Sequence, residues 1–254
     1  MSMVSPLADL VLYRSLSELR AEAKRSYAGL VWWIIRPLLS LAVYGLVFGV
    51  VFKSRETHFV VFLFSGIIAW EWFSNAVLRS ANSIIANRPL MQLVRVDPAL
   101  FPLSICLVDA VKFLFGLDIL LLLLPCQGIV PGWTWTLIPL IMLGELLLCA
   151  GFGTFFAALV PFCPDLALVL QTVLQLLMFL SGVFYRVETL PAIMGKVLAY
   201  NPMAMVISQF RTILLDGGVP PLFTFACVWS WGSVAFVAGC YLLRRFRGVY
   251  PKRW

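Results

Sequence analysis

Long apolar runs separated by short polar stretches set the pattern of this chain. A helix needs about 20 apolar residues, each rising 1.5 Å, to cross a hydrocarbon core about 30 Å thick. Six segments are predicted to do so: residues 30–52, 59–78, 99–124, 136–160, 166–185 and 222–243. The pattern therefore predicts an all-α integral membrane protein with six transmembrane helices, forming a single transmembrane domain over residues 1–254.

The first stretch that does not span, residues 6–27, has the period of an amphipathic helix. Its apolar positions Leu12, Leu16, Leu19 and Ala23 fall on one face, with charged residues elsewhere around the helix. Such a helix lies in the plane of a membrane surface. We expect an N-terminal interfacial helix on the cytoplasmic leaflet.

The second such stretch, residues 80–97, mixes polar and apolar positions and contains Pro89. It is too polar to span and too apolar for a bare loop. An exposed, partly apolar segment between two spans is typical of a docking surface for a soluble partner. The alternative is a helix that rests on lipid headgroups.

A third stretch, residues 186–221, holds two short apolar pieces, 190–199 and about 203–214, each too short to cross. Asp216 and the glycines after it end the second piece. The pattern predicts a re-entrant helical hairpin that dips into the outer leaflet. The last stretch, residues 244–254, is a basic tail typical of a topology anchor.

Composition agrees with a membrane protein, since 62% of the residues are hydrophobic and 12% are charged. A net charge of +7 is read here as the basic flanks of cytoplasmic loops rather than as a nucleic-acid surface. With both termini inside, 13 Lys and Arg residues flank the cytoplasmic side and five lie outside. We therefore expect a multi-pass protein of the bacterial plasma (inner) membrane with cytoplasmic termini.

Motifs for chemistry are missing from the sequence. It has no Gly-rich phosphate-binding loop, and His58 is its only histidine, so neither ATP binding nor zinc or triad catalysis by this chain is expected. The six cysteines are scattered and read as small apolar residues rather than as metal ligands. We expect no catalytic residue, no metal and no cofactor on this chain.

Charged residues inside the predicted spans normally mark function, and the candidates are Glu71, Asp109, Lys112, Asp118 and Glu145. Asp109 and Lys112 are three residues apart, so they can form an ion pair on one helix face. If Asp109, Lys112 and Asp118 instead relay ions, the chain is an ion-coupled secondary transporter. A membrane-embedded transferase is a further alternative, although it needs an acid, base or nucleophile that the sequence does not clearly supply.

Aromatic residues gather in or near the first and fifth spans and could line a pathway, because sugar rings stack on aromatic faces. Phe184 is one of these aromatic residues. We select the following channel-lining candidates, of which Gln175 alone is not aromatic: Tyr44, Phe48, Phe52, Gln175, Phe179 and Tyr185.

Several segments together resemble the ABC-type polysaccharide export permease family, whose members export O-antigen, capsule or teichoic acid polymers. The similarity runs through residues 28–52 (AGLVWWIIRPLLSLAVYGLVFGVVF), 65–77 (SGIIAWEWFSNAV) and 81–104 (ANSIIANRPLMQLVRVDPALFPLS), and through 179–191 and 200–217. Pro164 and Gly182 depart from the family pattern, which often has Arg and Pro there.

The resemblance implies an exporter permease that moves a polyprenyl-diphosphate-linked polysaccharide outward. It implies two copies of this chain and two ATP-binding cassette subunits that hold ATP and Mg, with membrane lipids as neighbours and no nucleic acid. The coupling residues would be Asn87, Arg88, Leu90, Met91, Leu93, Val94 and Arg95. The headgroup residues would be Arg14, Arg20, Lys24 and Arg25. Drug or small-lipid export by the same scaffold stays open.

Overall fold

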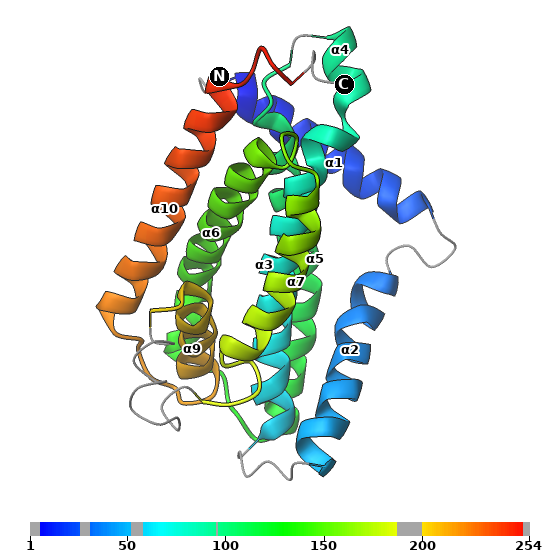
Figure 1. Cartoon of the computed structure of the whole chain (residues 1–254). Helices are drawn as coiled ribbons and strands as arrows, with labels where there is room; N and C mark the ends of the chain where they lie inside the picture. Colours follow the sequence, from blue (N-terminus) through cyan, green and yellow to red (C-terminus); the bar gives the residue numbers. More distant parts are fainter. Residues whose placement is uncertain (1–5, 26–30, 52–57, 95, 187–199, 251–254) are drawn as a thin grey trace.

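The computed structural model describes residues 6–25, 31–51, 58–94, 96–186 and 200–250. These residues form a bundle of helices, and no strand occurs within these ranges (Figure 1). The all-α prediction is confirmed for this part of the chain.

The long helices run side by side along the bundle and match the predicted spans. They are α2 (Val31–Gly45, continued by the π-helix η1, Leu46–Val51), α3 (Phe59–Ala86), α5 (Leu100–Cys126), α6 (Ile138–Leu159), α7 (Asp165–Leu180) and α10 (Leu222–Arg245). By length and apolar composition, stretches in α2, α3, α6 and α10 can each cross a membrane. The helix α5 is long enough but carries three charged residues, and α7 has 16 residues. The count of six spans therefore stays a prediction.

The core of the bundle is built around α3, in which every residue from Val61 to Trp70 is buried. This helix packs against α2, α5, α6, α7 and α9, and α6 in turn packs along α10. By contrast, α2 has one buried residue, Pro37, among those described in it. Apolar side chains that this single chain leaves exposed on α2 are suited to lipid or to another protein.

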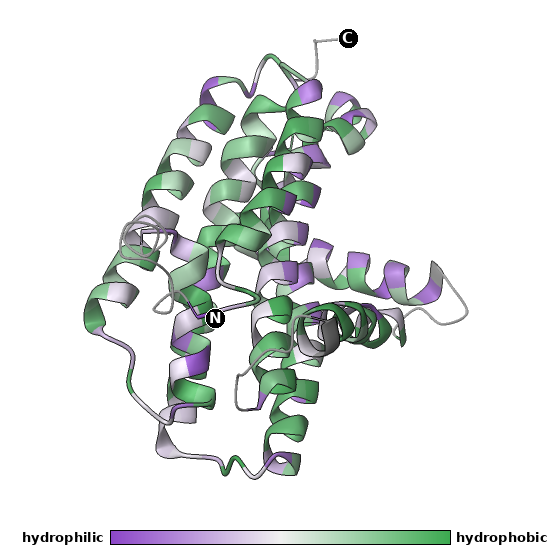
Figure 2. Ribbon diagram, turned by 60° about the horizontal axis from the view of Figure 1, so that its bottom comes forward, coloured by the Kyte–Doolittle hydropathy of each residue, from purple (hydrophilic) through white to green (hydrophobic). Residues whose placement is uncertain are grey.

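Helices α1 (Pro6–Arg25) and α4 (Arg88–Leu93) lie at one end of the bundle, where the chain also begins and ends (Figure 1). We call this the α4 end. Hydrophilic colouring gathers on α1 and at the bundle ends, whereas the long helices are mostly hydrophobic (Figure 2). Leu12 and Leu16 of the predicted apolar face are about half exposed, while Val11 and Ser15 are buried and Ser15 Oγ donates to Ser104 O of α5.

The segment 80–97, predicted as one separate piece, is divided in the structure. Residues 80–86 are the last turns of α3, because Ser80, Ser83 and Ile84 are buried and keep the helix packed. Asn87 then caps α3, donating its side-chain amide to Ser83 O at 2.8 Å, and α4 follows after this bend.

The opposite end of the bundle holds α9 (Pro202–Leu214) and the short 3-10 helix η2 (Trp133–Leu137), and we call it the α9 end. Asn201 begins α9, because its side chain accepts from Met203 N at 3.0 Å. Ten of the 13 residues of α9 are buried, so it packs into the bundle on α3, α6 and α10. The first arm of the predicted hairpin, 190–199, lies outside the described residues.

Candidate functional site

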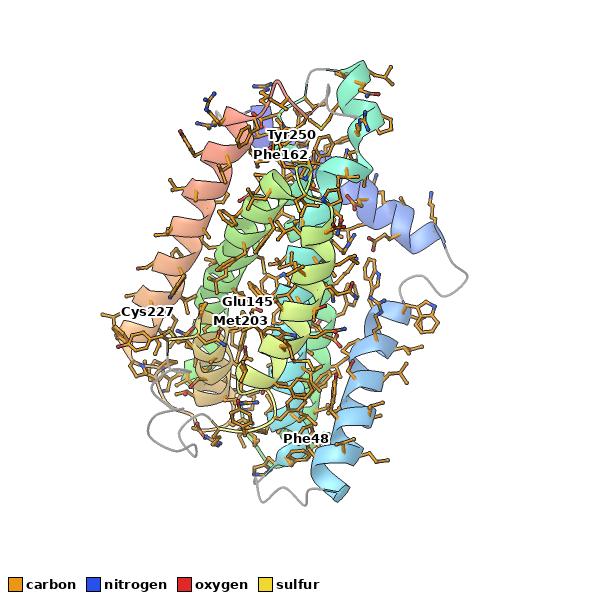
Figure 3. The ribbon with its side chains drawn as sticks, viewed as in Figure 1. Phe48, Glu145, Phe162, Met203, Cys227 and Tyr250 are labelled. Carbon is orange, nitrogen blue, oxygen red and sulfur yellow. The ribbon has the colours of Figure 1, made fainter. Side chains whose placement is uncertain are left out.

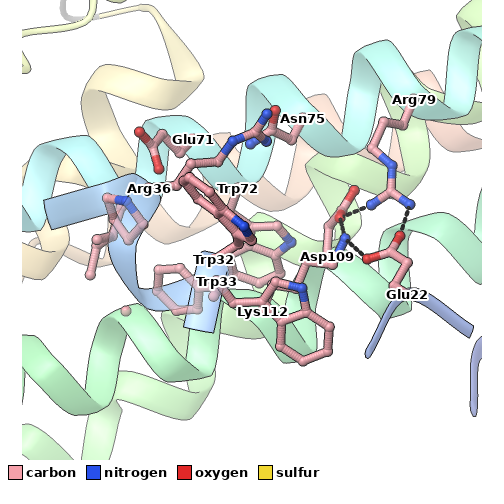
Figure 4. A pocket seen from close by; sticks show the side chains of 14 residues that line it. Glu22, Trp32, Trp33, Arg36, Glu71, Trp72, Asn75, Arg79, Asp109 and Lys112 are labelled. Atoms are coloured by element: carbon pink, nitrogen blue, oxygen red, sulfur yellow. Dashed lines mark hydrogen bonds and ion pairs between the residues drawn. The ribbon is translucent and has the colours of Figure 1, made fainter. Parts of the chain in front are cut away.

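A pocket of about 490 Å³ opens between α2, α3 and α5 next to the end of α1 (Figure 4). Its walls combine aromatic rings with charges of both signs. The polar and aromatic residues lining it are Glu22, Trp32, Trp33, Arg36, Glu71, Trp72, Asn75, Arg79, Asp109, Lys112 and Phe113. Pockets of this volume are typical of sites for small ligands.

One side of the pocket is a network of ion pairs centred on Asp109, whose side chain is 3% exposed. The predicted pair forms, with Lys112 Nζ 3.3 Å from Asp109 Oδ1. Arg79 of α3 also pairs with Asp109, and Glu22 of α1 contacts both cations at 2.6 Å. Glu18 lies 3.4 Å from Arg79. The network ties α1 to α3 and α5, which is the structural role expected of buried charges that have partners.

The other side of the pocket carries polar groups that this network does not use. Glu71 accepts a hydrogen bond from Ser40 Oγ at 2.6 Å, and its carboxylate lies in the field of Arg36. Asn75 is exposed and has no hydrogen-bond partner among the described residues. Trp32 is 50% exposed. Glu71, one of the charged residues that the sequence places inside a span, therefore faces the pocket between α2, α3 and α5.

The coupling candidates lie on and around α4. Leu90, Leu93 and Val94 are 39%, 83% and 56% exposed, whereas Met91 is buried against Ile84 and its neighbours. Arg88 is half-buried, and Arg95 lies outside the described residues. The structure thus gives α4 an exposed apolar face and a buried anchor.

Helix α1 contacts the bend between α3 and α4. Arg14 Nη2 donates to Asn87 Oδ1 at 2.6 Å, and its guanidinium lies 4.7 Å from the centre of the Phe101 ring. Of the other headgroup candidates, Arg20 and Lys24 are exposed, and the side chain of Arg25 is outside the described part of the chain. A motion of α4 would therefore be transmitted to α1 through this contact.

Beside α4, an apolar pocket of about 220 Å³ lies between α3, the turn before α7 and the C-terminal residues. Phe162 and Tyr250 meet there, with ring centres 5.8 Å apart (Figure 3). Tyr250 donates its hydroxyl to Ala158 O at 3.2 Å, and burial raises the pKa of Tyr250 well above its usual value. The tyrosine therefore stays neutral and anchors the chain end to α6.

The predicted channel-lining aromatics come together around Phe184, just after α7. Phe184 stacks on Phe48 with 4.3 Å between ring centres, and it lies 5.0 Å from Tyr44 and 5.2 Å from Phe179. Tyr185 donates its hydroxyl to Phe179 O at 2.7 Å. This aromatic cluster joins α2 to α7. Of the remaining candidates, Gln175 is exposed on α7, and Phe52 lies outside the described residues.

Arg211 of α9 holds the loop that carries Phe184. Its guanidinium donates to Gly182 O and Val183 O, both at 2.7 Å, and lies 3.5 Å from the centre of the Phe62 ring. The side chain is 5% exposed. Sequence reasoning counted Arg211 only as an outer-loop charge, although its place in an apolar helical pattern signalled a buried role.

The remaining charged candidates, Glu145 and Asp118, do not form part of a binding site among the described residues. Glu145 of α6 is fully buried, and neither of its oxygens has a partner among the described residues. Asp118 is exposed on α5. Within the described part of the chain, no group of three or more His, Cys, Asp or Glu residues could hold a metal ion.

The described residues form a bundle of apolar helices, four of which are long and apolar enough to cross a membrane, with α1 and α4 at one end and α9 at the other. This is the arrangement of a membrane protein, and the family match gives its class. The ABC-2 type transporter family model matches residues 14–215, so this chain belongs to that family. This match includes α1 from Arg14 onward, the pocket, α4 and α9.

The chain is similar in sequence to named relatives over most of its length. The chain is 27% identical over 213 residues to the O-antigen export system permease protein RfbA of Klebsiella pneumoniae, covering 83% of this chain and 82% of the relative. It is 29% identical over 248 residues to the RfbA of Myxococcus xanthus, covering 91% and 95%. It is also 25% identical over 212 residues to the polysialic acid transport protein KpsM of Escherichia coli, covering 80% of each.

Proposed function

We propose that this chain is the membrane-spanning permease subunit of an ABC exporter that moves a lipid-linked surface polysaccharide, most simply an O-antigen, out of the cytoplasm. Membership of the ABC-2 type transporter family carries the proposal. The names of the relatives supply the cargo class, since two are O-antigen export permeases and one transports polysialic acid. The last name favours a capsule polymer as the second candidate cargo.

In this proposal the energy comes from a partner. The chain has no Gly-rich phosphate-binding loop, so two ATP-binding cassette subunits hold the ATP and Mg. They dock at the α4 end on the exposed face of Leu90, Leu93 and Val94, with Met91 fixing α4 to the bundle. The α4 end and both termini then face the cytoplasm.

Two copies of this chain enclose the pathway in the proposed exporter. The nearly unburied helix α2 and the exposed side chains of α7 suit contact with a second copy. The aromatic cluster at the α9 end offers ring faces to a passing sugar chain. Arg20 and Lys24 on α1 attract the diphosphate or anionic lipid at the cytoplasmic surface.

The experiment is to purify the tagged chain gently from its native membrane and identify what accompanies it. We expect a subunit with a phosphate-binding loop in equal amount, together with ATPase activity. A pure homomer without ATPase activity would refute the proposal and favour the ion-coupled transporter.

A further inference from the structure

The pocket between α2, α3 and α5 is electrically balanced. Three carboxylates, Glu22, Glu71 and Asp109, face three cations, Arg36, Arg79 and Lys112. Arg79 and Lys112 already pair with Glu22 and Asp109, so a diphosphate that entered the pocket would find no net positive charge to offset the loss of its hydration. The pocket is therefore poorly suited to the anionic part of a lipid-linked substrate.

Its polar groups suit a neutral ligand that both donates and accepts hydrogen bonds. Asn75 offers an uncommitted amide, and the carboxylate of Glu71 can accept further bonds besides that from Ser40. A hydroxyl group both donates and accepts hydrogen bonds, so it can bond to the amide and to the carboxylate.

Aromatic rings complete the character of the site. Trp32 stands at the pocket half exposed, while Trp33 is held by Phe115 at 5.4 Å between ring centres and by Lys112 at 5.8 Å. Flat apolar rings beside hydrogen-bonding side chains match the two sides of a sugar ring, which has C–H faces and a hydroxyl rim. A lipid tail would use the rings but leave the polar groups without partners.

We propose that this pocket binds a sugar unit of the lipid-linked glycan, separately from its diphosphate. The proposal rests on the function proposed above. The volume of about 490 Å³ is ample for a sugar ring, and the pocket adjoins Glu22 near the end of α1. The exposed cations Arg20 and Lys24 of the same helix hold the diphosphate outside, while the attached sugar enters between α2 and α3. The permease thus checks the sugar before export.

The test is photo-crosslinking in cells that make the glycan. A benzophenone amino acid replaces Asn75 in the pocket, or Val234, which is 69% exposed on α10, as the matched control. Only variants that still export are used. We expect the Asn75 position to yield a chain that stains for carbohydrate, at least fivefold above the Val234 position, and to lose the signal when glycan synthesis is blocked. Equal labelling at both positions, or an adduct containing only phospholipid, would overturn the proposal.

Substitutions give a second, independent measurement. We expect Asn75→Leu and Trp32→Leu each to lower the rate of glycan export about tenfold, because each removes part of the sugar contact. Asn75→Gln should recover part of the rate, and Val234→Leu should change nothing. ATPase activity and the amount of chain in the membrane should stay normal. Unchanged export in both pocket variants would refute sugar binding.

Failure of this inference is distinguishable from failure of the proposed function. If export requires this chain but the pocket variants export normally and the crosslinks are absent, the proposed export function is retained and sugar binding in the pocket is refuted. If cells without this chain export the glycan normally, both the proposed export function and the sugar pocket are refuted.

Discussion

The most unusual residue environment in the chain is that of Asp109, a nearly buried carboxylate served by two cations from two helices. Its pairing with Lys112 joins residues one helical turn apart, but Arg79 and Glu22 bring in α3 and α1. Removing one partner of a buried ion pair is costly, because the other charge loses its compensation. The network is thus a sensitive point for stability.

Replacing Arg79 with Leu should destabilise the protein by about 2–4 kcal/mol, because it leaves Asp109 with one cation and Glu18 with none in the network. For a chain of this size that is about 5–10 °C in apparent melting temperature, measured on the purified protein in one detergent. Asp118→Asn, an exposed acid on the same helix α5, is the control and should melt normally. An unaltered melting temperature for Arg79→Leu would show that the network adds no stability.

For individual residues, the sequence predicts contacts between residues that are close together along the chain. The Asp109–Lys112 pair follows from a separation of three residues on a helix. Arg79 is 30 residues from Asp109 and Glu22 is 57 residues from Arg79, so only the packing of α1, α3 and α5 brings them together. For the same reason, Phe48 and Tyr44 could be chosen as aromatics, but their meeting with Phe184 could not be foreseen.

Among the elements, α6 and α10 make the closest helix contact, and glycine permits it. A Cβ on Gly239 of α10 would lie 2.6 Å from the backbone nitrogen of Phe155 in α6. Backbone cannot yield as a flexible side chain can, so the two helices would have to separate.

Gly239→Ala should therefore cost about 1–3 kcal/mol and lower the yield of folded protein. Gly248→Ala is the matched control, since nothing lies within 4 Å of a Cβ there. Size-exclusion profiles and melting in detergent measure both. If the Gly239 and Gly248 variants behave alike, the close helix contact is not required.

The helix α4 carries the second prediction at this scale. Leu93→Asp places a charge on a side chain that is 83% exposed, so the fold should tolerate it while an apolar interface should not. We expect insertion to be normal and the amount of co-purified ATP-binding subunit to fall at least tenfold, as loss of a central interface contact does. The same change at Tyr200, 67% exposed at the α9 end, is the control. Equal recovery of the partner with both variants would remove α4 from the interface.

Element positions were largely readable from the sequence, because a run of apolar residues has little choice but a buried or lipid-facing helix. The expected spans agree with α2, α3, α5, α6, α7 and α10 to within several residues. The exception is α3, which continues to Ala86 because its polar residues Ser80 and Ser83 are buried by neighbouring helices. By hydropathy, these serines mark the end of the second predicted span, whereas a packed helix can include them.

At the scale of the whole molecule, both ends of the chain lie at the α4 end, as expected from an even number of crossings (Figure 1). The basic flanks then predict which end faces the cytoplasm. In the proposed orientation, the α1–α4 contact and the pocket between α2, α3 and α5 lie toward the cytoplasmic side, and the aromatic cluster lies toward the outer side.

This sidedness is testable with single cysteines in a background lacking the six native ones. Val219→Cys, 54% exposed at the α9 end, should react with a membrane-impermeant maleimide in intact cells. Leu93→Cys should react only after the membrane is opened. The reverse pattern would invert the orientation and remove α4 from contact with any cytoplasmic ATPase.

The central claim is that this chain exports a surface glycan, and the most direct measurement is to delete it and follow the glycan. We predict that surface glycan disappears, that lipid-linked polymer accumulates inside the cell, and that the intact chain restores export. Surface glycan at its normal level in the deletion strain, with no internal polymer, would contradict the account.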